Sequence, residues 1–289
     1  MMWKTGALWA GTISALLFSV ACSKEEAHTE ADGEHAAQPA GAAGGEHGGS
    51  APAAAGGEHA AGHDVHWDYK GEGDPARWGD LKPEYAACKT GQAQSPIDIP
   101  ADTAAVKAGS ITLNYSNVPL KVINNGHTIQ VNNSAANTAD INGQAYELVQ
   151  LHFHGPSEHT VGGKSSDLEL HLVHKNAEGK LAVIGLMLDK GTENPVVSQI
   201  WSNLPTDVNQ EKEVAGTALD LKAALPADLA YYHYQGSLTT PPCSEGVMWY
   251  VLQNRGSVSE AQIAQFTGLF HGDARPVQPL NGREVVRSK

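Results

Sequence analysis

Histidines recur at strand-compatible spacing in two stretches of the sequence. In the first, QLHFHGPSEH at 150–159, His152 and His154 are two residues apart. Side chains two apart on a β-strand share a face, so both imidazoles are expected to point the same way. The second stretch is LELHLVH at 168–174, and its alternation places His171 on one face of a second strand. If the two strands are neighbours, three imidazoles meet at one point.

Three imidazoles with no thiolate nearby are a donor set that suits Zn²⁺. A structural zinc site usually closes with four protein ligands, whereas three leave a position for water, so the pattern predicts a catalytic site. His174 falls on the opposite face of its strand and is not expected to be a fourth ligand. Gln150 and Glu169 each lie two residues before a ligand, on its face, where they can accept ring N–H bonds and fix the tautomers.

Short strands are the main elements expected to position these histidines. Alternating or β-branched runs, separated by turns such as Asn142-Gly143, predict strands at 111–115, 121–123, 128–131, 146–153, 168–174, 181–188 and 246–252. Helices are predicted at 195–202 and 259–267, the second with Ser259 as its N-cap. The expected fold class is mainly β: a single domain built on a large, mostly antiparallel central sheet with a few short surface helices. The strand order does not follow from these patterns.

Further motifs extend the pattern beyond the two histidine strands. They are HWDY at 66–69, QSPIDI at 94–99, NGH at 125–127, SLTTPP at 237–242, Trp249, and ARPVQPL at 274–280. Together with the histidine stretches, they resemble the motifs of α-class carbonic anhydrases of the secreted bacterial type, in family order. The resemblance implies a lyase that uses zinc to hydrate CO2 reversibly to bicarbonate and a proton.

The resemblance also implies roles for individual residues. Zn²⁺ would be held by His152, His154 and His171, and zinc-bound hydroxide would attack CO2. Thr239 would orient the hydroxide, since a hydroxyl that donates to the carboxylate of Glu158 must accept from its other partner. The residues expected to contact CO2 or bicarbonate, mostly through a dry apolar wall, are Val173, Val183, Leu238, Thr239, Thr240, Val247 and Trp249.

Proton transfer to buffer is assigned by the same resemblance to His127, which follows Asn125-Gly126. An unperturbed imidazole titrates near 6.5, close to the ideal for such a relay. Tyr69 and Gln130 would help to organise the water chain between the metal and His127.

The chain has three cysteines, Cys22, Cys88 and Cys243. The resemblance implies a disulfide between Cys88 and Cys243, which would tether the loop that carries Thr239. Closing a loop of about 155 residues would stabilise the fold by roughly 5 kcal/mol in the chain-entropy model, so a reductant is expected to lower stability. The third cysteine, Cys22, is then either used up by lipidation or left as a free thiol.

Residues 1–21 have the pattern of a secretory signal peptide. Lys4 precedes an apolar run of about 15 residues, shorter than the roughly 20 that a membrane-spanning helix needs. The small residues before Cys22 suit either an ordinary signal peptidase or lipoprotein processing at Cys22. The expected localisation is secreted and periplasmic, with a lipid anchor to the outer membrane at Cys22 as the alternative to a plain signal peptide.

Residues 22–62 are rich in Ala, Gly, Glu and His and are predicted to be a disordered linker, because they cannot bury enough apolar surface to offset the entropy of ordering. The catalytic domain is therefore expected at 63–289. Eight acidic residues and one Lys at 23–64 contribute −7 of the net charge of −13. No basic surface is indicated, which argues against a nucleic-acid partner. The expected partners are CO2 and bicarbonate, with a membrane contacted only through the lipid anchor.

Three alternative functions compete with this interpretation. A cupin would use His152, His154 and Glu158 as its first metal motif, but the residues around His171 lack the Pro, Gly and Asn of a second cupin motif. A non-enzymatic zinc buffer could use the histidines of the tail, which are His28, His35, His47, His59 and His63. A catalytically inactive binding module of the same fold would have lost ligand histidines, and all three are present.

Overall fold

The computed structural model describes residues 65–107 and 109–289, which belong to one compact unit. Thirteen strands form the main sheet. Along the sheet these are β11 (Glu211–Leu219), β4 (Val118–Asn124), β5 (Ile129–Asn132), β7 (Gln144–His154), β9 (Leu168–Lys175), β10 (Leu181–Lys190), β13 (Glu245–Leu252), β12 (Tyr231–Ser237), β15 (Val286–Ser288) and β2 (Ala105–Val106). Off this path, β14 (Gly256–Val258) pairs with β10, and β3 (Ile111–Asn114) and β6 (Thr138–Ile141) extend from β7. A separate two-stranded sheet contains β1 (Asp98–Ile99) and β8 (Thr160–Val161).

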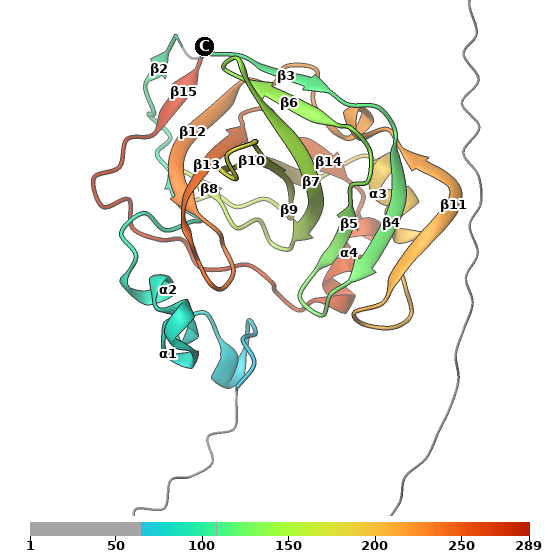
Figure 1. Ribbon diagram of the computed structural model, residues 1–289, viewed down its shortest axis with the longest axis horizontal. Coiled ribbons are helices and arrows are strands. Elements are labelled where there is room, and N and C mark those ends of the chain that lie inside the picture. The colour runs from blue at the N-terminus through green and yellow to red at the C-terminus, as the bar shows by residue number, and fades with distance from the viewer. Residues whose placement is uncertain (1–64, 108) are drawn as a thin grey trace, which may run out of the picture. The chain divides into compact units, whose positions relative to one another are not determined.

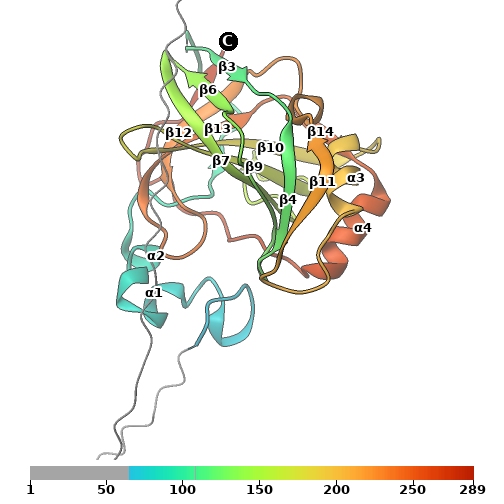
Figure 2. The ribbon, with the colours of Figure 1, turned by 45° about the vertical axis from the view of Figure 1, so that its right-hand side comes forward.

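Most neighbouring strands run in opposite directions, as the sequence predicts. Among the described residues nine strand pairings are antiparallel and four are parallel. The important exception is the parallel pairing of β10 with β13, at the centre of the sheet. Figures 1 and 2 show the strands crossing the whole unit, with β7, β9 and β10 in the middle of the sheet. The predicted mainly β fold class is confirmed.

Helices are few and short in the described part of the chain. They are η1 (Gly71–Gly73), α1 (Trp78–Leu81), η2 (Pro83–Tyr85), α2 (Ala87–Thr90), α3 (Pro195–Trp201), η3 (Leu221–Ala224) and α4 (Glu260–Leu269). The two predicted helices correspond to α3 and α4. Ser259 caps α4 as predicted, because its side chain accepts from the backbone of Gln262 and the Gln262 side chain accepts in return. None of the described helices is long and apolar enough to cross a membrane.

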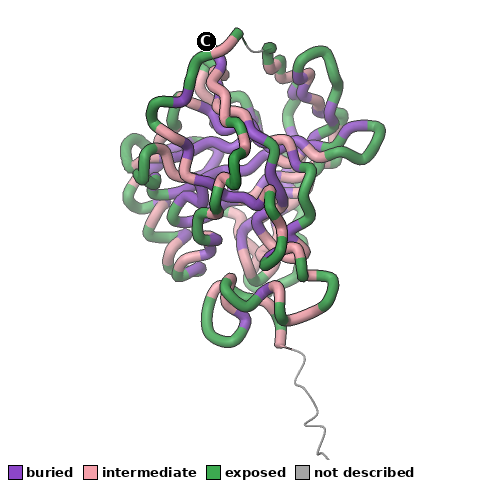
Figure 3. Tube along the Cα trace, turned by 90° about the vertical axis from the view of Figure 1, so that its left-hand side faces the viewer, coloured by how far each residue is buried: buried purple, intermediate pink, exposed green. Residues whose placement is uncertain are grey.

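Two apolar clusters occupy opposite faces of the sheet, as expected from side chains that alternate along each strand. The larger cluster includes Phe153 and Leu172, and α3 and α4 pack against it through Trp201 and Phe266. The smaller cluster includes Trp249 on the other face. Figure 3 shows the buried stretches running through the interior, with exposed segments mainly at the turns and ends.

Strand β7 contains a β-bulge that the sequence analysis did not anticipate. Its pairing with β9 shifts register between Leu148 and Gln150, and Val149 between them is 40% exposed. The buried positions of β7 therefore change parity, from Leu148 before the bulge to Leu151 after it. The strand as a whole cannot follow one strict alternation, although the stretch after the bulge does.

Several predictions concern residues outside those that the structure describes. They are the signal peptide at 1–21, the linker at 22–62 and the lipidation of Cys22. These predictions stay predictions.

Candidate metal centre

The three predicted ligands come together on the central strands. His152 on β7 is paired directly with His171 on β9, and His154 lies two residues further along β7 on the same face. The ring centres are 5.0 Å apart for His152 and His154, 5.1 Å for His152 and His171, and 4.7 Å for His154 and His171. Their candidate ligand atoms all lie within 4.8 Å of one another. The antiparallel register of two neighbouring strands is what makes the three imidazoles converge.

One ring nitrogen of each histidine is held by an oxygen outside the triad. His152 Nδ1 lies 2.8 Å from Gln150 Oε1, and His171 Nε2 lies 3.0 Å from Glu169 Oε1. Both contacts are those expected from the sequence. His154 Nδ1 lies 2.7 Å from the backbone oxygen of Asp273. An oxygen acceptor fixes the N–H on that nitrogen and leaves a lone pair on the other one.

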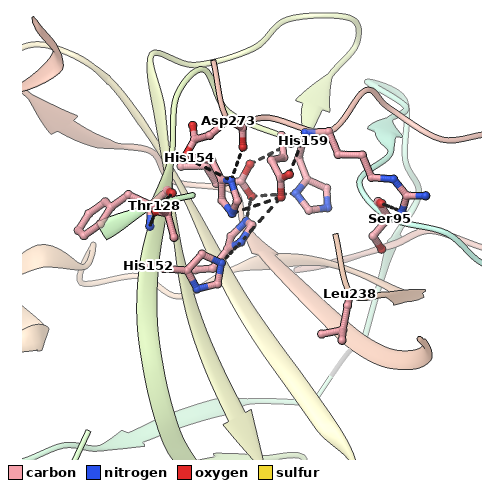
Figure 4. Close-up of polar contacts among 12 residues, drawn as sticks. Ser95, Thr128, His152, His154, His159, Leu238 and Asp273 are labelled. Carbon is pink, nitrogen blue, oxygen red and sulfur yellow. Dashed lines mark hydrogen bonds and ion pairs between the residues drawn. The ribbon is translucent and has the colours of Figure 1, made fainter. Parts of the chain in front are cut away.

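The remaining nitrogens are His152 Nε2, His154 Nε2 and His171 Nδ1, and they face a common centre. His171 Nδ1 is 3.3 Å from His152 Nε2, and buried His154 Nε2 has no hydrogen-bond partner. Burial lowers the pKa of His152 well below 6.5 and that of His171 to about 4, so both are neutral near pH 7. Figure 4 shows the group of side chains, with Asp273 beside His154. Three converging imidazole lone pairs fit a divalent cation such as zinc.

Glu158 lies directly beside this centre and is fully buried. Its Oε2 is 3.5 Å from His154 Nε2 and 4.0 Å from His171 Nδ1, while its Oε1 accepts the backbone N–H of Arg275 at 3.0 Å. Burial raises the pKa of Glu158 to about 8, against the opposing hydrogen bonds from Arg275 and the hydroxyl of Thr239. A bound divalent cation would also oppose the rise, because a positive charge favours the ionised carboxyl.

The predicted substrate wall is a contiguous apolar surface. Val183, Val247 and Trp249 belong to the smaller buried cluster, and Val173 and Leu238 pack against it. The Trp249 ring centre lies 4.9 Å from that of His171. Parallel pairing of β10 with β13 sets Val183 opposite Trp249 and so brings two distant runs of sequence together.

A cavity of about 120 Å³ opens on the same side of the sheet. Of the predicted site residues, those that line it are Tyr69, His127, Gln130, Gln150, His152, His154 and Thr240. The residue predicted to shuttle protons therefore shares a cavity with two of the predicted metal ligands.

The hydrogen-bonded network continues through His159, Tyr234 and Ser95, for which no role was predicted from the sequence. His159 Nδ1 lies 2.8 Å from Glu169 Oε1, its Nε2 lies 2.7 Å from the Tyr234 hydroxyl, and that hydroxyl lies 2.8 Å from Ser95 Oγ. Although burial raises the pKa of Glu169, His159 and His171 hold it well below its ordinary value. Because His159 is already bonded to Glu169, it supports the carboxylate that holds His171. The position of His159 in the first histidine stretch, at 150–159, was the sequence signal that could have indicated this role.

Asp273 and Arg275 were also missed as contributors to the site. Asp273 Oδ1 accepts the backbone N–H of Gly155 at 2.7 Å, so this residue holds both the ring of His154 and the backbone that follows it. Arg275 donates its guanidinium N–H groups to Gln94 Oε1, Ser95 O and Cys88 O. Both lie beside or within the ARPVQPL motif, but their partners are more than a hundred residues away.

Cys88 and Cys243 form a disulfide, as the resemblance implied, across a sequence separation of 155. Cys243 follows the loop that carries Thr239 and Thr240. The carbonyl of Cys88 accepts from Arg275, and that of Cys243 accepts from Gln94 at 3.0 Å. The disulfide joins the N-terminal segment to the loop, and the hydrogen bond from Arg275 connects both to the backbone next to Glu158.

A family model described as eukaryotic-type carbonic anhydrase matches residues 73–289. The chain belongs to the α-carbonic anhydrase family. Curated relatives named carbonic anhydrase include one from Pectobacterium atrosepticum, 44% identical over 78% of this chain and 93% of the relative. Another, from Klebsiella pneumoniae, is 46% identical over 76% of this chain and 90% of the relative.

Solved structures of α-carbonic anhydrases share the fold. The enzyme of Thermovibrio ammonificans, in complex with the inhibitor sulfanilamide, is 41% identical with a TM-score of 0.74, covering 78% of this chain and 99% of that one. A hyperthermostable carbonic anhydrase from a hydrothermal vent chimney is 44% identical with a TM-score of 0.75, covering 78% and 100%. Membership of this family of CO2-hydrating enzymes shows that the cupin alternative is wrong.

Proposed function

We propose that this carbonic anhydrase hydrates CO2 reversibly at a zinc ion held by His152, His154 and His171. The observation that carries the proposal is the convergence of three ring nitrogens, one from each histidine. The other ring nitrogen of each histidine contacts an oxygen of a neighbouring residue. Such a set offers neutral imidazole ligands and leaves room for a fourth, non-protein ligand. Zinc at this position would supply the lowered water pKa that makes a nucleophile available near neutral pH.

Thr239 and Glu158 are proposed to orient the reacting water. The Thr239 hydroxyl has one proton, which it donates to the carboxyl of Glu158, and a cation bound beside it would keep that carboxyl ionised. The oxygen of Thr239 then accepts a hydrogen bond from the reacting water and fixes its direction of attack. The backbone N–H of Arg275 holds the other side of the carboxyl in place.

CO2 is proposed to bind against the wall formed by Val173, Val183, Leu238, Val247 and Trp249. An apolar wall attracts a molecule without a net dipole and excludes competing water from the reacting face. The backbone N–H of Thr239 and the side chain of Thr240 are proposed to contact the oxygens of the substrate and of bicarbonate.

His127 is proposed to receive the proton that each turnover releases. It lines the same cavity as His152 and His154, and Tyr69 and Gln130 line this cavity too. An imidazole accepts and releases protons near neutral pH, which suits transfer to buffer.

Stopped-flow CO2 hydration with a pH indicator tests the proposal. The protein is assayed as isolated, after zinc removal and after zinc is restored. Fast hydration that disappears with the metal and returns with it is the expected result. A folded protein that carries one zinc ion and shows no hydration would contradict the proposed function, and zinc buffering would replace it.

For the N-terminal part we propose export to the periplasm and lipidation of Cys22. The pairing of Cys88 with Cys243 supports both, because disulfides persist in oxidising compartments and the pair leaves Cys22 as the third cysteine. Membrane fractionation of cells that express the full chain should find it membrane-bound, with Cys22→Ser released. A wild-type protein that is exported but entirely soluble would contradict lipidation.

A further inference from the structure

Thr128 is a buried threonine whose hydroxyl is bonded to the strand that carries two of the proposed metal ligands. The hydroxyl donates to the backbone carbonyl of Phe153 and accepts the backbone N–H of the same residue at 3.3 Å. Phe153 lies between His152 and His154 on β7. Figure 4 shows Thr128 beside these two histidines. One side chain from a neighbouring segment therefore holds both backbone groups of the residue between two proposed ligands.

The register of β5 with β7 ends just before this contact. Its last pair places Gln130 opposite His152, the first of the two histidines. Phe153 is opposite Leu170 on β9, so the sheet holds it from that side. On the β5 side, the hydroxyl of Thr128 extends the attachment of β7 by one residue beyond the last pair.

The position of Thr128 is itself fixed by the turn that precedes β5. The side-chain oxygen of Asn125 accepts the backbone N–H groups of His127 and Thr128, each at 2.9 Å. The backbone N–H of Asn125 donates to the carbonyl of Thr128 at 3.2 Å. A hydroxyl has a single proton, and that of Thr128 is donated to Phe153. Thr128 therefore joins the turn that carries His127 to the strand of the two histidines.

The segment with the two histidines has other anchors, which act at different points. The ring of Phe153 packs in the larger apolar cluster, and the backbone N–H of Gly155 donates to the carboxyl of Asp273. The first anchor acts on a side chain, and the second acts on the residue after the second histidine. Thr128 instead acts on the backbone between the two histidines, and that backbone sets how far apart the two imidazoles lie.

We propose that Thr128 is a positioning residue of the metal centre, whose hydroxyl holds His152 and His154 in a converging arrangement before the metal binds. Ligands bind a metal well when they are held within roughly 0.5 Å of the productive geometry. Release of the Phe153 backbone lowers the fraction of molecules in that geometry, and the apparent dissociation constant rises by the same factor. The inference rests on the proposed function and names a residue that touches neither the metal nor a ligand ring.

The test measures zinc dissociation constants by chelator competition, with the full-length chain throughout so that the tail is the same in every variant. Thr128→Val keeps the shape of threonine without the hydroxyl, and its zinc affinity should fall by about tenfold, the lower end of what loss of an outer hydrogen-bond partner costs. Thr128→Ala also lacks the hydroxyl and should show a similar fall. Thr128→Ser keeps the hydroxyl and should remain close to wild type. Near-UV circular dichroism checks that each variant is folded.

Thr103→Val is the matched control. Thr103 is also buried, and its hydroxyl donates to the backbone carbonyl of Pro100 at 2.6 Å. Both Thr103→Val and Thr128→Val should lower the urea midpoint of the metal-free protein, because each removes a hydrogen bond to a backbone carbonyl. Zinc affinity should fall in Thr128→Val and remain at the wild-type value in Thr103→Val.

Wild-type zinc affinity in folded Thr128→Val and Thr128→Ala would overturn the inference. An equal loss of affinity in Thr103→Val or in Thr128→Ser would also overturn it, because the loss would then reflect general destabilisation and not the hydroxyl. If the wild-type protein neither binds zinc nor hydrates CO2, the proposed function fails and the inference fails with it. A wild type that does both, beside hydroxyl-free variants of unchanged affinity, overturns the inference alone.

Discussion

His171 and His174 lie three residues apart on β9 and face opposite sides of the sheet. Both are almost completely inaccessible to solvent, and burial lowers the pKa of each to about 4. His174 lies 2.6 Å from the hydroxyl of buried Tyr115, and within residues 65–107 and 109–289 no other imidazole ring is in stacking contact with it. His171 faces two other imidazoles and a carboxylate. Burial and a low pKa are therefore common to both, and what distinguishes the proposed metal ligand from the core histidine is that its free nitrogen converges with those of two other imidazoles.

The largest expected effect comes from removing each histidine in turn. His171→Ala should weaken zinc binding by more than the roughly 10- to 100-fold that loss of an outer hydrogen-bond partner costs, and should abolish hydration. His174→Ala should leave zinc affinity unchanged and lower stability by about 1–3 kcal/mol, because the Tyr115 hydroxyl loses its partner in the core. Chelator competition and urea unfolding measure the two effects. Equal zinc affinity in the two variants would contradict the assignment of His171 as a ligand and His174 as a core residue.

The free energy of unfolding should fall at acid pH partly because of His174. Its pKa is about 4 in the folded protein and 6.5 as a free group, so the unfolded chain binds the extra proton between these values. Its contribution is present above pH 6.5 and is lost as the pH falls toward 4, by about 3 kcal/mol at 1.36 kcal/mol per unit. Metal-free His174→Gln should lose correspondingly less stability between pH 7 and pH 4 in urea unfolding. Parallel losses in both proteins would contradict this assignment.

Glu169 sharpens the comparison because it supplies what His174 lacks, a carboxylate that fixes the ring of a ligand. Glu169→Ala should weaken zinc binding by roughly 10- to 100-fold, since the tautomer of His171 is no longer set. Glu169→Gln keeps an acceptor of the same shape and should fall at the lower end of that range. Zinc dissociation constants from chelator competition give the measurement, and circular dichroism confirms folding. Unchanged affinity in Glu169→Ala would show that the ring is oriented by packing alone.

The smallest effect is expected at Asp273, which acts on His154 from outside the two strands. Asp273→Ala leaves the backbone carbonyl that His154 bonds but removes the carboxyl that holds Gly155, so zinc affinity should fall by about tenfold. Asp273→Asn retains the acceptor and should remain close to wild type in the same zinc competition. Full affinity in Asp273→Ala would show that the carboxyl does not position His154.

The sequence predicted the elements that carry strong periodicity or capping signals. All seven predicted strands exist, with ends shifted by a few residues, and α3 and α4 begin where Pro195 and Ser259 indicated. Strand β11 was missed because it lies at one end of the sheet, and its polar, largely exposed residues lack a clear alternation. The aromatic run of β12 was a usable signal that was not taken up.

The sequence by itself determined which side chains share a face, because alternation within a strand is a local property of the backbone. It therefore gave His152, His154 and His171 with the acceptors Gln150 and Glu169, while the roles of Thr239 and His127 came only through family resemblance. Tertiary structure decided which strands are neighbours, the bulge at Val149, the contact of Asp273 with His154 and the pairing of His66 with His127. Those depend on packing between segments far apart in the chain, which no local pattern encodes.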